Sequence, residues 1–397
     1  MLRVRDPFHR SQLAIAALFC SLGFQYATWA SRIPAIKEDL DLSAAEVGVL
    51  LMAAGIGAAV SFPLVAVLMR RLGSQRLALL SALCLALLLL ALAGAPNYPV
   101  ALLVMCVDGV LVGCLNVAMN AQGAELEKRY ERNAMARLHA TFSGGSLLAA
   151  LLASGMNAVT SAVAAHFGAA ALFLLLLVVC ARTGLLTERP AEAETAGEES
   201  GAAAGAVAVK KKSRWTVPSR VTLWMCVAMA FGTVTEGAMN DWSALYLEDV
   251  AEASAELAPL GIAVVSGMMV VARLFADGWR SRWGDGRVVL SGSVLAGAGL
   301  ALALLSGGLV PALLGFACVG LGIAAVTPCV YVAAAGQGSD SLTLVAAMGT
   351  TGLLAGPPLI GFIAHASSLV WGLAAVAASA LVVSACSTRI RWPATTG

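Results

Sequence analysis

The sequence predicts an all-α polytopic membrane protein whose twelve transmembrane helices form two pseudo-symmetric six-helix bundles. Three observations lead to this prediction. Of the 397 residues, 59% are hydrophobic and only 12% are charged, whereas roughly a quarter of an ordinary soluble chain is charged. Apolar stretches of about 20 residues, the length that crosses a bilayer, recur along the chain. One charged, low-complexity segment divides these stretches six and six.

The first bundle is predicted within residues 1–186. Its apolar stretches occupy residues 12–33, 44–68, 77–95, 99–121, 136–158 and 163–183. The first of them follows three arginines near the N-terminus and therefore has the outline of a signal peptide. It is longer than the apolar core of a signal peptide, which has about 7–15 residues, so we interpret it as the first membrane helix.

The second bundle is predicted within residues 219–397. Its apolar stretches occupy residues 220–246, 257–279, 287–306, 309–335, 342–364 and 367–388. Between the bundles, residues 187–218 begin with several glutamates, continue with alanine and glycine, and end with Lys210-Lys211-Lys212-Ser213-Arg214. Low complexity with blocks of like charge is typical of a flexible linker.

The placement of Lys and Arg predicts the orientation in the membrane. The loops after the even-numbered helices are placed on one side of the membrane, together with both termini. Of the 25 Lys and Arg residues, Arg32 and Lys37 then fall on the opposite side and the others do not. Cytoplasmic loops carry the excess of basic residues, so we expect both termini and the linker to be cytoplasmic.

Other classes of protein find no support in the sequence. The net charge of +2 does not indicate a nucleic-acid partner, and the nine cysteines all lie in apolar stretches without a CxxC pair. We therefore expect no disulfide framework, metal or cofactor. The HExxH, GxSxG and P-loop motifs are absent, so we expect neither an enzyme nor an ATP-driven pump.

The two halves also repeat each other. Arg71-Leu72-Gly73 follows the second helix, and Arg282-Trp283-Gly284 follows the eighth. Trp29 near the end of the first helix and Trp242 near the end of the seventh are separated by almost the same number of residues as these two motifs. This pattern indicates a duplicated six-helix unit. Repeats of this kind place a substrate site near the middle of the membrane, between the halves.

Several segments carry a resemblance to a known family. They are Trp29-Ala-Ser-Arg32-Ile-Pro34-Ala-Ile-Lys37, Asn116-Val-Ala-Met-Asn120-Ala-Gln122-Gly123, His139-Ala-Thr-Phe-Ser143-Gly144-Gly145, Glu236-Gly237 with Asp241-Trp242-Ser243, and Arg273 to Asp277. With the six-plus-six arrangement and the paired Arg-x-Gly loops, the chain resembles the major facilitator superfamily. More narrowly, it resembles bacterial inner-membrane members related to fucose permease, which are sugar–proton symporters.

The resemblance implies a bacterial cytoplasmic membrane as the location, a lipid bilayer as the surroundings, and a small solute and protons as partners; we expect a monomer. The chain departs from the family at one loop. The family has an acid just before the Arg-x-Gly of the first half, where this chain has Arg70, and Ala66 stands at the position that matches Asp277. The gating pair that the resemblance implies is therefore expected only for Arg273 and Asp277 in the second half.

Polar residues of the first half fall on two helical stripes. Ser21, Gln25, Thr28, Trp29 and Arg32 share one face of the first helix, and Asp108, Asn116 and Asn120 share one face of the fourth. We expect Gln25, Trp29, Asn116 and Asn120 to line the substrate cavity. The alternatives are an interfacial tryptophan with a snorkelling Arg32, and asparagines that only bond neighbouring helices.

The seventh helix holds two carboxylates, Glu236 and Asp241, with Asn240 between them. A charge at the centre of a bilayer costs roughly 2.5–3.5 kcal/mol on insertion scales, so membrane helices rarely keep one without a use for it. We predict that Glu236 and Asp108 carry protons or contact substrate, while a permanent structural pair is the alternative for Glu236.

Asp241 lies at the depth of Arg32 if the repeat holds, so these two residues are predicted to pair across an outer gate. We place Asn240 and, as a weaker candidate, Tyr331 in the substrate cavity. His166 and His365 are interpreted as interfacial.

Together these features predict a secondary active transporter of a small polar solute, such as a sugar or a related metabolite, driven by protons through alternating access. A proton antiporter that exports drugs or metabolites is the alternative. A membrane sensor without transport activity is a remote one, since the linker is the one sizeable soluble segment.

Overall fold

A computed structural model of the protein describes residues 6–132, 134–187 and 218–392, without the side chains of Ala136, Asp277 and Ser339. All regular secondary structure in these ranges is helical. The predicted linker, residues 187–218, lies almost wholly outside the described residues. The all-helical fold class is confirmed.

By their internal contacts the residues fall into two compact units. The first contains Met1–Leu40 and Ala53–Ala204, and the second contains Asp41–Met52 and Gly205–Gly397. The proposed domain boundaries, 1–186, 187–218 and 219–397, stay a prediction.

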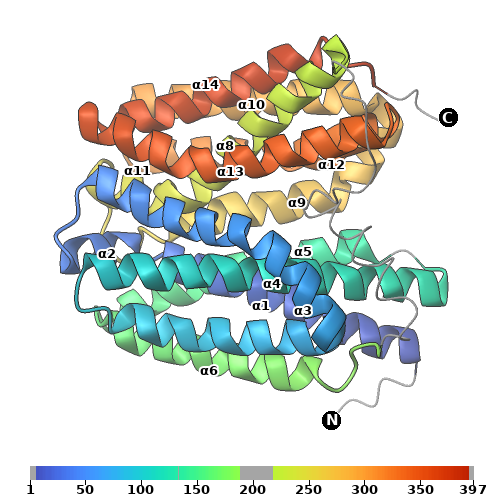
Figure 1. Ribbon diagram of the computed structural model, residues 1–397. Coiled ribbons are helices and arrows are strands. Elements are labelled where there is room, and N and C mark those ends of the chain that lie inside the picture. The colour runs from blue at the N-terminus through green and yellow to red at the C-terminus, as the bar shows by residue number, and fades with distance from the viewer. Residues whose placement is uncertain (1–5, 133, 188–217, 393–397) are drawn as a thin grey trace. The chain divides into compact units, whose positions relative to one another are not determined.

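Six helices are described in the first unit (Figure 1). They are α1 (Pro7–Ala30), α2 (Ile33–Asp39), α3 (Ala44–Ala93, whose first residues group with the second unit), α4 (Tyr98–Tyr130), α5 (Met135–Asn157) and α6 (Val163–Ala181). Two predicted membrane helices are merged in α3, which is interrupted at Gly73, where φ is 71° and ψ is 165°. This backbone conformation is essentially restricted to glycine, so Gly73 allows the chain to turn back.

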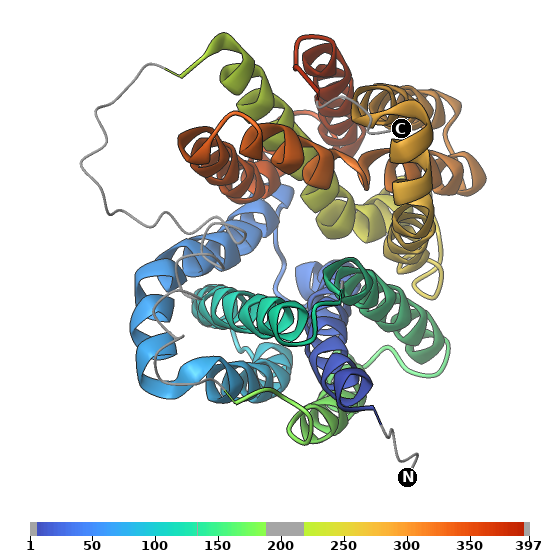
Figure 2. The same ribbon diagram turned by 90° about the vertical axis from the view of Figure 1, so that its right-hand side faces the viewer.

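Seven helices are described in the second unit. They are α8 (Arg220–Asp249), α9 (Leu260–Trp283), α10 (Asp285–Ser306), α11 (Leu309–Ile323), α12 (Val326–Ala335), α13 (Ser339–Ala366) and α14 (Leu369–Ser387). Gly284 between α9 and α10 has φ 81° and ψ 151°, close to the conformation of Gly73. The repeat predicted from sequence therefore includes the same turn geometry. Figure 2 shows many helices of each unit nearly end-on.

Each of the twelve predicted spans coincides with a helix of the described chain. The 50 residues of α3 supply two spans, and α11 with α12 supplies one, because the stretch predicted as a single helix is broken at Ala324 and Ala325. By length and composition, nine helices of the described residues are apolar and long enough to cross a membrane. At 1.5 Å per residue, the parts of α3 before and after Gly73 are about 43 Å and about 30 Å long, so each is long enough for one crossing.

Small residues let the helices of the first unit approach closely. A Cβ atom added to Gly109 on α4 would lie 1.8 Å from the carbonyl oxygen of Ala54 on α3, and one added to Gly57 would lie 1.9 Å from that of Cys106. The two backbones are therefore in direct contact, as small residues allow between membrane helices. This contact fixes the rotation of α4 at the residue beside Asp108.

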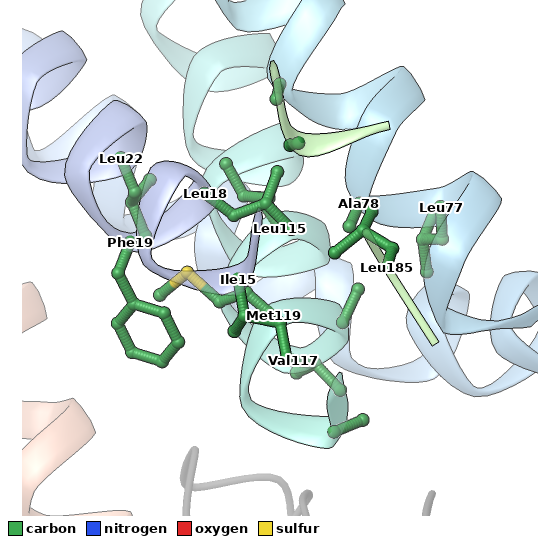
Figure 3. Packing of buried hydrophobic residues seen from close by; sticks show 14 of the residues in the cluster. Ile15, Leu18, Phe19, Leu22, Leu77, Ala78, Leu115, Val117, Met119 and Leu185 are labelled. Atoms are coloured by element: carbon green, nitrogen blue, oxygen red, sulfur yellow. The ribbon is translucent and has the colours of Figure 1, made fainter. Parts of the chain in front are cut away.

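A buried apolar cluster holds α1 against α4 (Figure 3). Ile15, Leu18, Phe19 and Leu22 on α1 belong to the same cluster as Leu115 on α4. The α1 positions recur every three or four residues, and Gln25 continues the same face one turn later. The apolar contact therefore turns the polar stripe of α1 toward α4.

The segment that follows α6 is joined to α3 and α4 by hydrogen bonds of Gln122. The Nε2 of Gln122 on α4 donates to Ser74 Oγ at 2.7 Å and to the carbonyl of Leu186 at 2.8 Å, while the amide of Leu186 donates to Gln122 Oε1 at 2.8 Å. Gln122 is fully buried. Both polar atoms of one amide are thus used to join α3, α4 and the chain after α6.

Candidate functional site

Gln25 and Asp108 are brought together in the interior of the first unit. The Nε2 of Gln25 on α1 donates to Asp108 Oδ1 on α4 at 2.6 Å, and the two residues are only 1% and 4% exposed. No cation of the described residues lies within ion-pair distance of Asp108. A neutral amide satisfies one carboxylate oxygen but does not balance a charge, so Asp108 is the buried acid whose charge has no described counterion.

Two polar atoms on this face of α1 have no hydrogen-bond partner within the described part of the chain. They are Gln25 Oε1 and Trp29 Nε1. Trp29 is buried and its ring lies edge-on to that of Tyr26, with centroids 5.0 Å apart. A buried polar group without a partner costs free energy, so these atoms are the natural points of contact for a bound polar molecule.

The two asparagines of α4 bond along their own helix. The Nδ2 of Asn120 donates to the carbonyl oxygen of Asn116 at 2.8 Å and to its Oδ1 at 2.7 Å. Asn120 is buried and Asn116 is half-buried. These bonds lie within one helix, so they do not supply the interhelical role considered as the alternative. The assignment of both residues to the substrate cavity stays a prediction.

Arg32 is buried at the end of α1. Its Nε donates to His166 Nδ1 on α6 at 3.1 Å, and its Nη1 lies 3.4 Å from the carbonyl oxygen of Ser161. His166 is fully buried. The interpretation of His166 as interfacial stays a prediction, while its side chain is covered by the protein and Arg32 donates to one of its nitrogens. Sequence analysis missed this contact because the two residues are far apart in the chain.

In the second unit, Glu236 has a cationic partner. Arg273 Nη2 on α9 lies 3.2 Å from Glu236 Oε1 on α8, and the two side chains are 24% and 25% exposed. The Nδ2 of Asn240 donates to the backbone carbonyl of Glu236 at 3.0 Å. Glu236 and Asp108 were grouped by their sequence setting, but their surroundings differ: one carboxylate faces a guanidinium and the other a neutral amide.

The remaining predicted residues are placed as follows. Asp241 is buried on α8, and Tyr331 is half-buried on α12. Asp277 lies on α9, and its side chain is outside what the structure describes. The predicted Arg273–Asp277 gate therefore stays a prediction, with Glu236 now a defined partner of Arg273.

The turn after α9 holds an ion pair that sequence analysis did not single out. Arg280 Nε lies 2.8 Å from Asp285 Oδ1, and Arg280 Nη2 lies 3.2 Å from Asp285 Oδ2. The pair spans Gly284, so the turn brings the two residues into bidentate contact. The signal available in the sequence was an acid directly after the second Arg-x-Gly motif.

The two tryptophans that the repeat matches share an unusual property. Trp29 on α1 and Trp242 on α8 are both buried, and the indole nitrogen of each has no hydrogen-bond partner among the described residues. No group of three or more metal-ligating side chains occurs in the described ranges. The matched tryptophans indicate that each unit presents a similar donor from its first long helix.

Buried carboxylates, amides and guanidinium groups on otherwise apolar helices are typical of membrane proteins that move polar solutes. Fold and site therefore define the class of protein: a polytopic membrane transporter. The chain matches the Major Facilitator Superfamily profile over residues 13–341, and it belongs to this family. The superfamily assignment made from sequence is confirmed, and the family is one of solute transporters rather than enzymes.

The chain is similar over nearly its whole length to bacterial proteins. It is 31% identical over 392 residues to an uncharacterised MFS-type transporter of Yersinia pestis, an alignment that covers 96% of each chain. It is 32% identical over 365 residues to an uncharacterised transporter of Sinorhizobium fredii, covering 89% of this chain and 91% of the relative. It is 29% identical over 378 residues to the membrane protein MosC of Rhizobium meliloti, covering 94% and 88%.

Solved structures share the fold. A mutant of the nucleoside transporter NupG superposes with a TM-score of 0.72 at 14% identity, over 97% of this chain and 99% of that one. A second NupG structure gives 0.67 at 14% identity, over 97% and 98%. At this identity the similarity shows the fold alone.

Proposed function

We propose that this transporter carries a small polar solute across the bacterial cytoplasmic membrane in company with protons, by alternating access, with both termini in the cytoplasm. The observation that supports proton coupling is Asp108, a buried acid whose described partner is the neutral Gln25. An acid without a counterion tolerates the low-dielectric interior when it binds a proton, which is the property that a coupling group needs.

Asp108 is a better candidate for the coupling group than Glu236. Glu236 forms an ion pair with Arg273 at 3.2 Å, so its carboxylate already has a partner of opposite charge, which Asp108 lacks among the described residues. We assign Asp108 to proton loading and Glu236 to a polar pair that keeps α8 and α9 together or contacts the solute.

Gln25 and Trp29 are proposed to contact the solute. Gln25 Oε1 accepts hydrogen bonds and Trp29 Nε1 donates them, and neither has a described partner. A solute with several hydroxyl or amide groups supplies both partners. Sugars and related metabolites have this chemistry, and so do nucleosides, which the structural neighbour NupG transports according to its name.

The first experiment identifies the solute. The purified protein is screened by thermal shift against sugars, nucleosides, amino acids and amines at two pH values, and each stabilising compound is then tested for counterflow in proteoliposomes. Counterflow is expected for at least one polar solute. Its absence across the panel would support a membrane sensor without transport activity.

The second experiment tests the coupling group. Asp108→Asn keeps the shape of the side chain but cannot load a proton, so it should abolish proton-driven accumulation and spare counterflow. Glu236→Gln is the matched variant, and any loss that it causes should affect accumulation and counterflow alike. Proton-driven accumulation by Asp108→Asn at the wild-type level would refute the assignment. Entry of protons with the solute indicates symport, and movement in the opposite sense indicates antiport and export.

We also propose that Arg32 and Asp241 pair when the outer mouth is closed. The proposal rests on the repeat, which matches Trp29 with Trp242, and on the burial of both charged residues. Each single charge reversal should lose transport, and the exchange Arg32→Asp with Asp241→Arg should restore it. Failure of the exchange to rescue counterflow, with normal protein levels in the membrane, counts against the pair.

A further inference from the structure

The contact between Arg32 and His166 fixes the protonation state of the imidazole. Arg32 Nε lies 3.1 Å from His166 Nδ1, and the residues are 3% and 0% exposed. A guanidinium keeps its protons in proteins, so Arg32 must be the donor and Nδ1 the acceptor. His166 is therefore neutral in this contact, with its hydrogen on Nε2.

Arg32 is the described hydrogen-bond partner of the His166 side chain. Nε2 is buried and has no hydrogen-bond partner within the described ranges. The charged group whose field acts on the imidazole is Arg32, which lies between α1 and α2 at the N-cap of α2. The titratable groups of α5 are Arg137 and His139, near the opposite end of that helix from Asn157. At 1.5 Å per residue they lie about 27 Å or more along the axis from that end.

We propose that neutral His166 is a positioning residue that holds the Arg32 guanidinium against α6, and that a proton taken up by His166 releases it. The proton binds the lone pair of Nδ1, which then no longer accepts the Arg32 Nε–H bond. The imidazolium and the guanidinium repel each other at contact distance. Arg32 keeps its own charge and loses this contact with α6.

The inference concerns the end of the first unit that the proposed topology places outside the cell. Acid outside would then control the Arg32 side chain independently of proton loading at Asp108. The link to transport rests on the proposed function. The titration of the Arg32–His166 contact does not, so the two can fail separately.

The test is the thermal stability of the full-length purified protein as a function of pH. His166→Asn places an amide oxygen near the position of Nδ1, so it keeps an acceptor for Arg32 but cannot titrate. His166→Leu removes both properties. Because the folded protein holds neutral His166, the wild-type melting temperature should fall as pH drops from neutral to mildly acidic. The Asn variant should match the wild type at neutral pH without this fall, and the Leu variant should be less stable at neutral pH.

Two further measurements keep the inference falsifiable. His365→Asn, at an exposed histidine of α13, is the control and should keep the wild-type fall. If the Leu variant does not fold, imidazole ¹⁵N shifts of the labelled wild type should show Nδ1 without a proton at neutral pH. A wild-type acid response in His166→Asn, or a protonated Nδ1, would overturn the inference.

Counterflow at different external pH values connects the contact to transport. The wild-type rate should change on external acidification, and the rate of His166→Asn should not. If no solute is transported but the stability response depends on His166, the proposed function fails and the inference stands. If transport occurs and its response to external pH is the same in His166→Asn, His166 does not act through Arg32 in transport.

Discussion

The side-chain amide of Gln25 on α1 donates a 2.6 Å hydrogen bond to Asp108 on α4, and this bond joins the two polar stripes of the first unit. Both residues are buried. The bond therefore has a structural consequence as well as the functional one proposed above, because removal of either partner leaves a polar group in an apolar interior.

Replacing Gln25 by Leu should destabilise the protein by about 1–3 kcal/mol, because the Asp108 carboxyl loses its described donor. The double variant Gln25→Leu with Asp108→Leu should be more stable than the sum of the single effects predicts, since both polar groups are then gone. Denaturation of the detergent-solubilised variants in a double-mutant cycle measures this. Strictly additive losses would show that the two side chains do not interact.

Replacing Arg273 by Ala should cost about 1–2 kcal/mol, because Glu236 then loses its cationic partner. The pair is about a quarter exposed, so the loss should stay below the roughly 3–5 kcal/mol observed when a fully buried pair is broken. The exchanged pair, Glu236→Arg with Arg273→Glu, should recover most of the stability. Arg282→Ala, at an exposed residue of the same helix, is the control and should be neutral.

Replacing Gln122 by Leu should lower the free energy of unfolding by about 1–3 kcal/mol, because the backbone groups of Leu186 lose a buried partner. The segment after α6 should also become more accessible to protease. Arg129→Ala is the matched control, since Arg129 reaches the same segment through an exposed 3.4 Å contact with Thr187. Equal effects of the two substitutions would contradict the role assigned to Gln122.

Alanine at Gly73 or Gly284 should destabilise its unit by about 1–3 kcal/mol, because both glycines have positive φ with extended ψ. Helical glycines with open surroundings provide matched controls: Gly155 on α5 for the first unit and Gly278 on α9 for the second. Alanine at these controls should be neutral or stabilising by up to about 1 kcal/mol. Thermal denaturation of the four variants compares the positive-φ glycines with the helical ones. Similar changes in stability for all four would contradict the role assigned to Gly73 and Gly284.

The first turn of α1 should loosen in acid. The hydrogen bond from His9, the backbone amide of Phe8 and the nearby Arg132 hold the pKa of Asp6 below its usual value. A depressed pKa means that Asp6 stabilises the fold at pH values above its ordinary pKa and loses this effect as pH falls through the lowered value. Hydrogen exchange of the Phe8 amide should therefore show an acid-dependent loss of protection that Asp6→Asn lacks. The same loss in Asp6→Asn would assign it to another group.

Each apolar stretch found by hydropathy coincides with a helix of the described residues, because a bilayer crossing requires about 20 apolar residues and this requirement is local in sequence. The internal repeat was also visible, since Arg71-Leu72-Gly73 and Arg282-Trp283-Gly284 carry the glycines that the two similar turns require. Breaks within a single apolar stretch were not predicted. A signal for the break at Ala324 and Ala325 was present but was not used: Pro328 has no N–H to donate to the carbonyl of Ala324, which favours a helix boundary there.

The contacts of the polar residues could be predicted only in part from the sequence. Periodicity placed Gln25 and Asp108 on the correct stripes, and composition marked Glu236 as a charge that needs a partner or a proton. It could not say that Asp108 meets a neutral amide while Glu236 meets Arg273, or that His166 accepts from Arg32. Helix periodicity orders residues along one face of one helix. The partner across a contact depends on how glycines such as Gly109 and apolar residues such as Leu18 set the rotation and separation of neighbouring helices, which is a property of the packed bundle.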